Sequence, residues 1–510
     1  MQFNSFSFIF VFLPVTLAGY LLLRKTRFAN AFIFIASIFF YASSALWYLL
    51  PLFATALLDF IVGQYIADSK DDRFRSHMLW LSVVANLALL SVFKYTTWLT
   101  GDLSRGLAVY GIAFSPITLA LPPAISFYTF QSMSYTIDIY RREFKPYRSV
   151  IDYLSFVSFF PHLVAGPIMR ARDLLPQLAR IRDLPSASKV SVALFMILFG
   201  LFQKTVLADN FGLIVESIQR LIPVNGLTPG LGLVFTYAFA FQIYCDFAAY
   251  TTIARGVARL FGVELIRNFL TPYFSSNPSE FWSRWHISLS SWLRDYLYIP
   301  LGGSRDGRLM TLRNLMITML LGGLWHGAGV FFILWGLWHG LLLVLYRLLP
   351  IDSIVVRHLG RLGKLLSIVI FFHLTCIGWI FFRATPEQFM PIVRSIMELP
   401  GAVASIVIAY EPYLGWSLII HPWTLVTILV GMVKGFVSAN WTFSIYCWGL
   451  LLFALPLWIT DYLGWRKQGE FPDLFEAMSW PVRTVAILVL LYGIIFFARR
   501  EANEFIYFAF

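Results

Sequence analysis

Long apolar runs constrain the fold of this 510-residue chain more than any other feature of its sequence. A helix needs about 20 apolar residues to cross a hydrocarbon core of ~30 Å. Stretches of this order recur from end to end, and they predict an all-α polytopic membrane protein with about 10 to 13 membrane helices, together with re-entrant or interfacial helices. The runs are residues 8–23, 29–50, 80–93, 190–207, 230–250, 310–345, 365–382, 423–433, 442–459 and 485–497.

The composition agrees with this class and gives no sign of a soluble domain. Charged residues make up only 13% of the chain, whereas a soluble chain carries about 25%. No tandem repeat and no low-complexity linker marks a boundary. We therefore expect one membrane domain with three parts: spanning helices over residues 1–120, a functional core over 121–347, where prolines and polar residues interrupt the apolar sequence, and further spanning helices over 348–510.

Basic residues gather in alternate loops, which indicates the orientation in the bilayer. Positive loops favour the cytoplasm, so placing residues 24–27, 70–75, 141–148 and 170–182 inside predicts an extracytoplasmic Met1. The residues before the first apolar run lack the basic start of a signal peptide. The net charge of +12 is thus explained by loops facing anionic lipid. Because it is spread over many loops, nucleic acid is not an expected partner.

The spacing of cysteines and histidines predicts no metal site. The sequence has no His-Glu-x-x-His motif, and it has no Gly-x-Ser-x-Gly nucleophile elbow. Cys245, Cys376 and Cys447 lie far apart in apolar surroundings, so we expect buried packing thiols rather than a disulfide framework.

The densest set of ionisable groups lies in "NPSEFWSRWHISLSSWLRDYLYIPLGG", residues 277–303. Ionisable groups at membrane depth are costly and are therefore functional candidates. On one continuous helix the tryptophans and the arginines would face different sides, with His286 between them. The alternative is an interfacial amphipathic helix whose arginines meet lipid phosphates. The turn that follows, "PLGGSRDGR", could hold phosphates through backbone N–H groups and Arg305.

Two histidines occur in a doubled Leu-Trp-His-Gly within "LGGLWHGAGVFFILWGLWHG", residues 321–340. Glycines surround His326 and leave room for a ligand, and a neutral buried imidazole is an available general base. On an unbroken helix, His326 and His339 would be about 220° apart in azimuth and roughly 20 Å apart along the axis. A break at Gly327 to Gly329 would shorten that distance. The alternative for either histidine is a hydrogen bond to a neighbouring helix.

Four other polar residues lie in apolar sequence: Asp246, Gln131, Asp138 and His162. Each could serve only as a buried hydrogen-bonding partner, which is the interpretation that we favour for each one taken singly.

Long blocks of the sequence resemble a known family. The blocks "FQIYCDFAAYTTIARGVARLFGVELIRNFLTPYFSSNPSEFWSRWHISLSSWLRDYLYIPLGG" and "NLMITMLLGGLWHGAGVFFILWGLWHG" resemble the membrane-bound O-acyltransferases (MBOAT), and the bacterial alginate O-acetyltransferase branch is the most similar. "LPPAISFYTFQSMSYTIDIYRRE", "FVSFFPHLVAGPIMR" and the ending "EFIYFAF" fit that branch too. Teichoic-acid D-alanyl transfer proteins share the same core.

The resemblance implies an MBOAT fold around a central funnel or tunnel, in a bacterial inner membrane. It assigns catalysis to His326, with His286 at the second family position. The chain departs from the family in "CDFAAYTTIARG", which replaces the commoner "FDFSGYSDMAIG"; Asp246 still matches. Candidate substrate or donor contacts are Arg284, Trp285, Ser288, Arg294, Arg305, Trp325 and Asp246, while His339 and Gln131 are expected to give structural support.

The expected reaction is acyl transfer from a thioester to a hydroxyl. His326 would take the hydroxyl proton, and His286 would orient the acceptor or stabilise the developing oxyanion. The donor substrate would be acetyl-CoA, bound through basic cytoplasmic residues, and no permanently bound cofactor is expected. A periplasmic partner of the SGNH type and a polysaccharide machinery would receive the acetyl group.

Three alternatives stay open at this point. The first is D-alanyl transfer from a carrier protein to a cell-wall polymer, the second is a transporter or flippase that uses the tunnel without chemistry, and the third is a non-catalytic scaffold. We also expect His326 and His286 to approach one cavity that is reachable from the cytoplasm and narrows near them.

Overall fold

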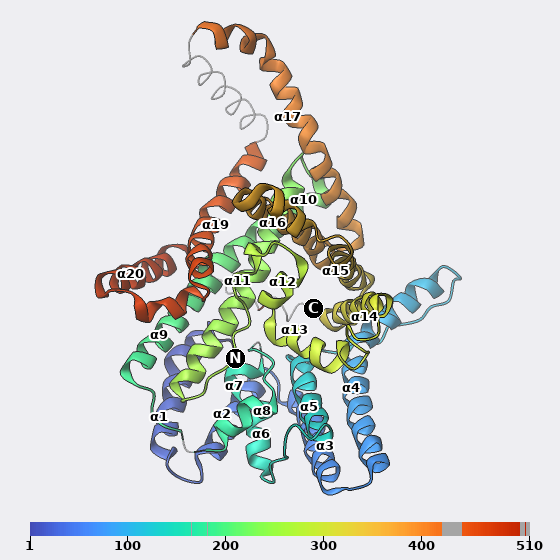
Figure 1. The fold of residues 1–510 in the computed structure, drawn as a ribbon, viewed down its shortest axis with the longest axis vertical. Coiled ribbons are helices and arrows are strands. Elements are labelled where there is room, and N and C mark those ends of the chain that lie inside the picture. The colour runs from blue at the N-terminus through green and yellow to red at the C-terminus, as the bar shows by residue number, and fades with distance from the viewer. Residues whose placement is uncertain (165, 181, 421–440, 500–504, 506–510) are drawn as a thin grey trace.

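The computed structural model describes residues 1–164, 166–180, 182–420, 441–499 and 505 (Figure 1). The predicted run at 423–433 and all of the ending except Phe505 lie outside these residues. The α-helices are α1 (Leu13–Leu23), α2 (Ala29–Ala42), α3 (Leu49–Asp68), α4 (Asp72–Ala108), α5 (Ile125–Tyr140), α6 (Val150–Ser158), α7 (Phe160–Leu163), α8 (Ala171–Leu178), α9 (Ala187–Phe202), α10 (Asp209–Asn225), α11 (Leu231–Leu260), α12 (Pro278–Arg284), α13 (Ile287–Leu293), α14 (Arg308–His326), α15 (Val330–Leu348), α16 (Ile351–Arg383), α17 (Pro386–Ile420), α19 (Trp441–Lys467) and α20 (Trp480–Phe497).

Short segments of tighter or wider helix join several of these elements. The π-helical segments are η1 (Phe8–Phe12), η3 (Gln203–Ala208) and η5 (Arg294–Tyr298), and the 3₁₀ segments are η2 (Leu46–Tyr48), η4 (Pro272–Phe274) and η6 (Phe471–Ala477). Within the described residues no strand is present, so the prediction of an all-α chain is confirmed.

Eight helices in the described part of the chain are long and apolar enough to span a membrane. Two shorter apolar helices, Phe8–Leu23 and Ala29–Ala42, bring the total to the lower bound of the predicted range. Among these spans α11 is the most enclosed, because 83% of its apolar window is buried. The corresponding share for α20 is only 6%. Figure 1 shows α11 near the middle of the molecule and α20 at its outline. The core is therefore organised around α11, which packs against α9, α10 and α17.

One end of the molecule collects the basic loops. Ion pairs join the end of α3 to the segment after α5, that segment to the start of α8, and the residue before α8 to η5, so these lie together. We call this the basic end, and we call the end where α2 finishes and α5 begins the opposite end. The ion pairs are Arg148–Asp68, Arg172–Glu143 at 2.9 Å and Arg170–Asp295 at 2.6 Å.

The predicted membrane run at 310–345 divides into two helices. The helix α14 ends at His326, the chain turns through Gly327, Ala328 and Gly329, and α15 packs back against α14. Two glycines allow this close contact: a Cβ atom on Gly336 would lie 2.4 Å from the Met319 carbonyl oxygen, and one on Gly323 would lie 2.3 Å from that of Phe332. The doubled motif thus lies on two arms of a hairpin, and the unbroken-helix geometry does not apply.

The continuous helix considered for residues 277–303 is also wrong. The segment breaks after α12, because His286 adopts a left-handed conformation with φ 43° and ψ 54°. Trp285 and Trp292 are buried, so the segment is not an amphipathic helix that lies on the membrane surface. The break turns His286 into the interior of the molecule.

Candidate active site

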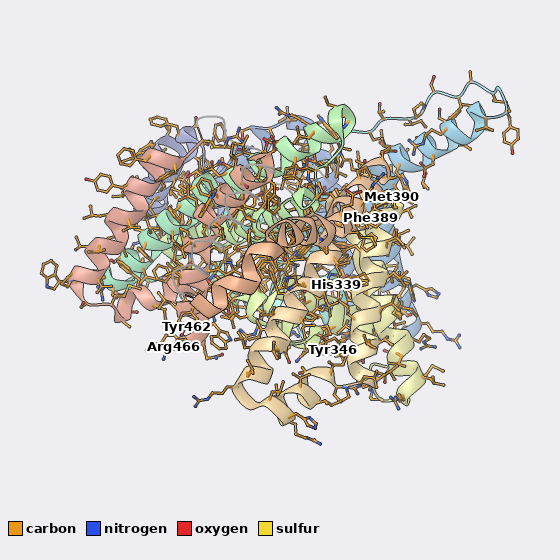
Figure 2. The ribbon with its side chains drawn as sticks, turned by 90° about the horizontal axis from the view of Figure 1, so that it is seen from above. His339, Tyr346, Phe389, Met390, Tyr462 and Arg466 are labelled. Carbon is orange, nitrogen blue, oxygen red and sulfur yellow. The ribbon has the colours of Figure 1, made fainter. Side chains whose placement is uncertain are left out.

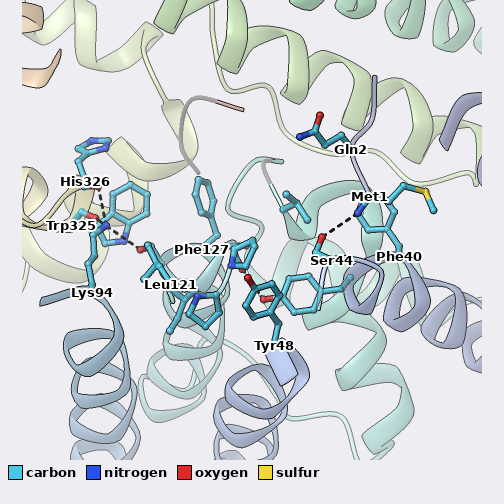
Figure 3. Close-up of a pocket in the computed structure, with 17 residues that line it drawn as sticks. Met1, Gln2, Phe40, Ser44, Tyr48, Lys94, Leu121, Phe127, Trp325 and His326 are labelled. Atoms are coloured by element: carbon cyan, nitrogen blue, oxygen red, sulfur yellow. Dashed lines mark hydrogen bonds between the residues drawn. The ribbon is translucent and has the colours of Figure 1, made fainter. Parts of the chain in front are cut away.

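His326 ends α14 at the inner wall of a cavity of about 360 Å³ (Figure 3). Its side chain is only 3% exposed. The cavity lies towards the opposite end, because its other walls come from the N-terminus, the end of α2 and the start of α5, together with Lys94 from within α4. Its rim includes the exposed Ser44. The lining residues include Met1, Gln2, Phe40, Tyr41, Tyr48, Lys94, Pro122, Pro123, Ser126, Phe127, Trp325 and His326.

Lys94 of α4 fixes the end of α14. Its ammonium group donates hydrogen bonds to the carbonyl oxygens of Trp325 and His326, the latter at 2.9 Å (Figure 3). The neighbouring Tyr95 hydroxyl donates to the Leu324 carbonyl at 2.7 Å. The last carbonyls of a helix lack intrahelical partners and carry partial negative charge, so a cation there is favourable. Our sequence reasoning missed Lys94, although a lysine that continues an apolar run is a functional candidate in its own right.

His286 lies beside His326, and a neighbouring amide sets its tautomer. The two imidazole ring centroids are 6.4 Å apart. The Oδ1 atom of Asn268 accepts hydrogen bonds from the Ser288 backbone N–H at 3.1 Å and hydroxyl at 2.9 Å, so it is an acceptor. The His286 Nδ1 atom, 3.2 Å from the same oxygen, therefore carries the hydrogen. In the neutral imidazole the Nε2 atom is then an acceptor, which suits a substrate hydroxyl and does not suit an oxyanion.

Aromatic rings enclose the two histidines. The His326 ring contacts Trp325 at 5.0 Å, Trp335 at 4.8 Å and Phe382 at 5.4 Å between centroids. Phe247 meets the His286 ring edge to face at 4.6 Å. Such walls exclude water and strengthen the electrostatic interactions inside them.

A second cavity, of about 390 Å³, is lined by Trp282, whose ring lies 5.8 Å from that of Trp335 in the aromatic wall. It is formed by α12, α13, η5, α14 and α15, and it includes the exposed Arg294 of the basic end. Its polar lining consists of Ser279, Ser283, Ser290, Ser291, Arg294, Tyr298 and Thr318. His326 lines only the first cavity and His286 lines neither. The geometry thus differs from our expectation of one cavity shared by both histidines.

The candidate contacts fall into two groups. Trp325 lines the first cavity and Arg294 the second, while Arg305 is exposed and bonds the carbonyls of its own turn. The others support the loop that carries His286: Ser288 bonds Asn268, Arg284 pairs with Glu280 at 3.0 Å and donates to Leu270 and Thr271, and Trp285 is buried against Phe281 and Trp379.

Asp246 lies away from both cavities. On α11 its carboxylate is 2.7 Å from the Lys204 ammonium, which also lies 3.0 Å from Asp209. The three side chains are buried, with exposed fractions of 1 to 3%. This arrangement joins η3, α10 and α11 and is that of a buried ion triad within the core.

The residues expected to give structural support are both buried. Gln131 donates to the Phe156 carbonyl at 3.0 Å and bonds the His162 ring at 2.9 Å. His339 lies inside the molecule on α15 (Figure 2), and its ring packs against Trp335 at 4.8 Å. Neither His339 ring nitrogen has a hydrogen-bond partner among the described residues. The packing role thus has a geometric basis, whereas the hydrogen bond that we expected of His339 is not seen there.

At the basic end, burial and two guanidinium groups shift the pKa of the Asp295 carboxyl in opposite directions. Burial acts to raise the pKa of its carboxyl, but the hydrogen bonds from Arg294 and Arg170 outweigh it, so the pKa lies below its usual value. The Arg170 guanidinium also lies 5.2 Å from the Tyr296 ring. This cluster keeps a fixed negative charge between two cations beside the second cavity.

Comparison with known proteins gives one consistent family. Residues 33–350, which include His286 and His326, match the model of the membrane-bound O-acyltransferase family. The chain is 38% identical over 391 residues to the probable alginate O-acetylase AlgI of Pseudomonas aeruginosa, covering 76% of this chain and 73% of that protein. It is 31% identical over 550 residues to the peptidoglycan O-acetyltransferase of Helicobacter pylori, covering 100% and 98%. The teichoic acid D-alanyltransferase of Bacillus subtilis is 28% identical over 273 residues, covering 51% and 68%. The chain therefore belongs to the membrane-bound O-acyltransferase family and is an O-acyltransferase.

Proposed function

We propose that the protein transfers an acetyl group, or a similarly short acyl group, from a cytosolic thioester to an extracytoplasmic polysaccharide, with the basic end in the cytoplasm. The observation that carries this proposal is the position of His326. It lies at the inner wall of a cavity that faces the opposite end, while a second cavity approaches the same aromatic wall from the basic end. A donor and an acceptor could thus reach one imidazole from opposite sides of the membrane.

The chemistry that we assign to His326 is general base catalysis. Its imidazole takes the proton from a hydroxyl in the first cavity as the hydroxyl oxygen attacks the thioester carbonyl carbon. The new C–O bond forms and the C–S bond breaks, and the leaving thiolate receives the proton from His326. The His286 Nε2 atom, an acceptor in the tautomer that Asn268 imposes, orients the incoming hydroxyl.

The donor that we favour is acetyl-CoA. Arg294 and Arg305 are exposed at the basic end, where they can meet phosphates, whereas Arg284 is engaged by Glu280. Acetyl transfer is favoured over D-alanyl transfer because the alginate and peptidoglycan acetyltransferases match more of the chain at higher identity than the D-alanyltransferase does. The acceptor in the membrane step would be a hydroxyl of a periplasmic SGNH-type partner, which then modifies the polymer.

The test is transfer of labelled acetyl groups by the purified full chain in lipid nanodiscs, with the partner present. Wild-type protein should move label from acetyl-CoA to the partner. Replacement of His326 by Ala should lower the rate about 10²- to 10⁴-fold, the usual contribution of a general base. His358→Ala is a matched control, because His358 is exposed at the start of α16 and bonds only the Ile354 carbonyl of its own helix among the described residues.

Three results would contradict the proposal. Full transfer by the His326→Ala variant would remove the catalytic assignment. Transfer from an acyl carrier protein but not from acetyl-CoA would favour the D-alanyl type of donor. Movement of intact labelled donor into sealed vesicles without any acyl transfer would favour a transporter.

A further inference from the structure

A small polar cavity lies among α9, η3, α11, α19 and η6, and it shares no lining residue with the two cavities described above. Its volume of about 30 Å³ is room for about two water molecules. No described lysine, arginine or histidine lines it. The lining side chains that carry oxygen atoms are Gln203, Tyr244, Thr251, Thr252, Thr271, Asp461 and Glu470.

The carboxylate of Asp461 is buried at this cavity without a counterion. Its Oδ1 atom accepts a hydrogen bond from the Tyr244 hydroxyl at 3.0 Å, and the residue is 9% exposed. The ion pairs among the described residues do not include Asp461, and the Arg284 guanidinium, which donates to Thr271, pairs with Glu280 instead. A buried charge is costly unless it is paired or binds a cation. The Asp461 carboxylate therefore needs a positive partner.

Two nearby arginines do not meet this need, because other carboxylates engage them. Arg255 pairs with Glu470 and lies 3.4 Å from Asp473. Arg267 lies 2.9 Å from Asp473. Two guanidinium groups thus balance two carboxylates, and the charge of Asp461 is left over. One further positive charge would complete the balance.

Gln203 gives a second, independent indication of a ligand. It is 4% exposed and lines the cavity, and its Oε1 atom has no hydrogen-bond partner among the described residues. A buried acceptor without a partner has lost its hydration with no compensation. The Thr251 hydroxyl donates to the Ala248 carbonyl at 3.1 Å, so its oxygen keeps lone pairs for a further contact. Acceptors from η3, α11 and α19 thus surround one small space.

We propose that this cavity binds one monovalent cation of the size of Na⁺. The Asp461 carboxylate supplies the charge, and the Gln203 amide and the Thr251 hydroxyl supply neutral oxygen atoms. Hard cations prefer oxygen ligands of these kinds. The single unbalanced charge favours a monovalent ion over a divalent one. In the described part of the chain no three His, Cys, Asp or Glu side chains are grouped so that they could hold a metal ion, which also argues against a transition metal.

The position of the cavity gives the cation a structural effect. It would join η3, α11 and α19, which lie far apart in the sequence. Phe269 and Thr271 line the cavity as well, and the neighbouring Asn268 bonds the His286 ring. Binding of the cation should therefore stabilise the fold and hold the segment that positions His286.

Binding of radioactive sodium to the purified full chain in nanodiscs tests the proposal directly. Wild-type protein should bind Na⁺ saturably, with one ion per chain. In a parallel measurement, NaCl replaces N-methyl-D-glucamine chloride at constant ionic strength, so that general charge screening does not change. The unfolding temperature should rise and then level off, because a ligand that binds only the folded chain stabilises it.

Asp461→Asn removes the charge and keeps an acceptor for the Tyr244 hydroxyl. It should raise the Na⁺ concentration at half-saturation at least about tenfold, because the contact of the ion with a charged group is lost. Asp138→Asn is the matched control. Asp138 is likewise buried and accepts from a tyrosine hydroxyl, that of Tyr296 at 2.7 Å, and it lines none of the three cavities. Its half-saturation should equal that of wild type.

Three results would overturn the proposal. The first is no saturable Na⁺ binding by wild-type protein, and the second is an unchanged half-saturation in Asp461→Asn. The third is an unfolding temperature that ignores Na⁺ but falls with rising pH in wild type and not in Asp461→Asn, which would show that Asp461 carries a proton instead. If Asp461→Asn does not fold, the wild-type binding curve still decides. Neither measurement involves acetyl transfer, so failure of the proposed function would leave this inference intact.

Discussion

Gly336→Ala should inactivate the enzyme through the geometry of one hairpin. Gly336 lies where α15 crosses α14, and an added Cβ atom would sit 2.4 Å from the Met319 carbonyl oxygen and 3.1 Å from the Leu320 Cα atom. Carbon–oxygen contacts between helices are ordinarily about 3.3 to 3.6 Å, so the helices must separate by about 1 Å. Both contacts are backbone atoms, which cannot rotate away.

Two opposing free-energy terms set the expected size of the effect. Replacing glycine by alanine within a helix stabilises it by about 1 kcal/mol, whereas overpacking a tight contact costs about 1 to 3 kcal/mol. We therefore expect a net loss of up to about 2 kcal/mol in the free energy of unfolding. The effect on activity should be larger, because a shift of about 1 Å in a catalytic group can cost about 10²-fold in rate. The residue next to Gly336 is Trp335, which contacts the His326 ring.

The assay pairs thermal unfolding in nanodiscs with the labelled acetyl transfer described above. Gly106→Ala is the control: Gly106 lies within α4, and an added Cβ atom would meet no heavy atom within 4 Å. It should keep wild-type activity and unfold at the same or a slightly higher temperature. Wild-type activity in Gly336→Ala would refute the argument that close contact of α14 and α15 positions the active site.

Four further predictions follow from contacts around the core. Lys94→Met removes the cation from the end of α14 and should lower kcat at least tenfold, measured by acetyl transfer, because the carbonyl of His326 loses its anchor; unchanged kcat would contradict this. Asn268→Leu frees the His286 tautomer and should lower kcat about tenfold, and it should also lower the unfolding temperature because the Ser288 N–H and hydroxyl lose their acceptor; a KM effect alone would argue against an orienting role. Lys204→Met leaves two buried carboxylates without a cation and should cost about 3 to 5 kcal/mol in unfolding free energy, whereas a neutral result would show that the carboxylates are protonated. The lowered pKa of Asp295 means that its contribution to stability is present above about pH 3.9, the unfolded value, and is lost as the pH falls through the folded value. Asp295→Asn should therefore flatten the acid limb of the unfolding profile, and an identical limb in wild type and variant would contradict the linkage.

The class of fold, the family and the enzyme type could all be predicted from the sequence, since apolar run length and long matching blocks carry that information. The geometry of the site could not. Periodicity treats residues 310–345 as one helix, and only contacts between distant segments decide that Gly327 begins a turn. The left-handed conformation of His286 depends on tertiary bonds to Asn268, eighteen residues earlier in the chain. The contacts of Lys94 could not be predicted because its partners lie more than two hundred residues away.

Asp246 shows a different limit of sequence reasoning. A carboxylate within an apolar run is a functional candidate by default, yet its partner Lys204 lies on a different helix, where no local pattern in the sequence indicates the pairing. Trp335 and His339 show a further limit, because their ring nitrogens have no hydrogen-bond partner among the described residues. A sequence lists donors and acceptors, but only coordinates show which of them remain unpaired.

The buried ion triad has a consequence for the insertion of the protein into the membrane during its synthesis. Lys204 and Asp209 lie on the continuous helix of residues 187–224, which is synthesised before α11 and its Asp246. A single charged residue at the centre of an inserting segment costs about 2.5 to 3.5 kcal/mol, so the earlier helix leaves the translocon with its two charges already neutralising each other. The helix α11 inserts later with the carboxylate of Asp246, and the Lys204 ammonium is by then already in the membrane to pair with it. The order of these residues along the chain therefore matches the order in which their charges enter the membrane. If Lys204 and Asp246 were exchanged, the first helix would insert with two negative charges and no counterion.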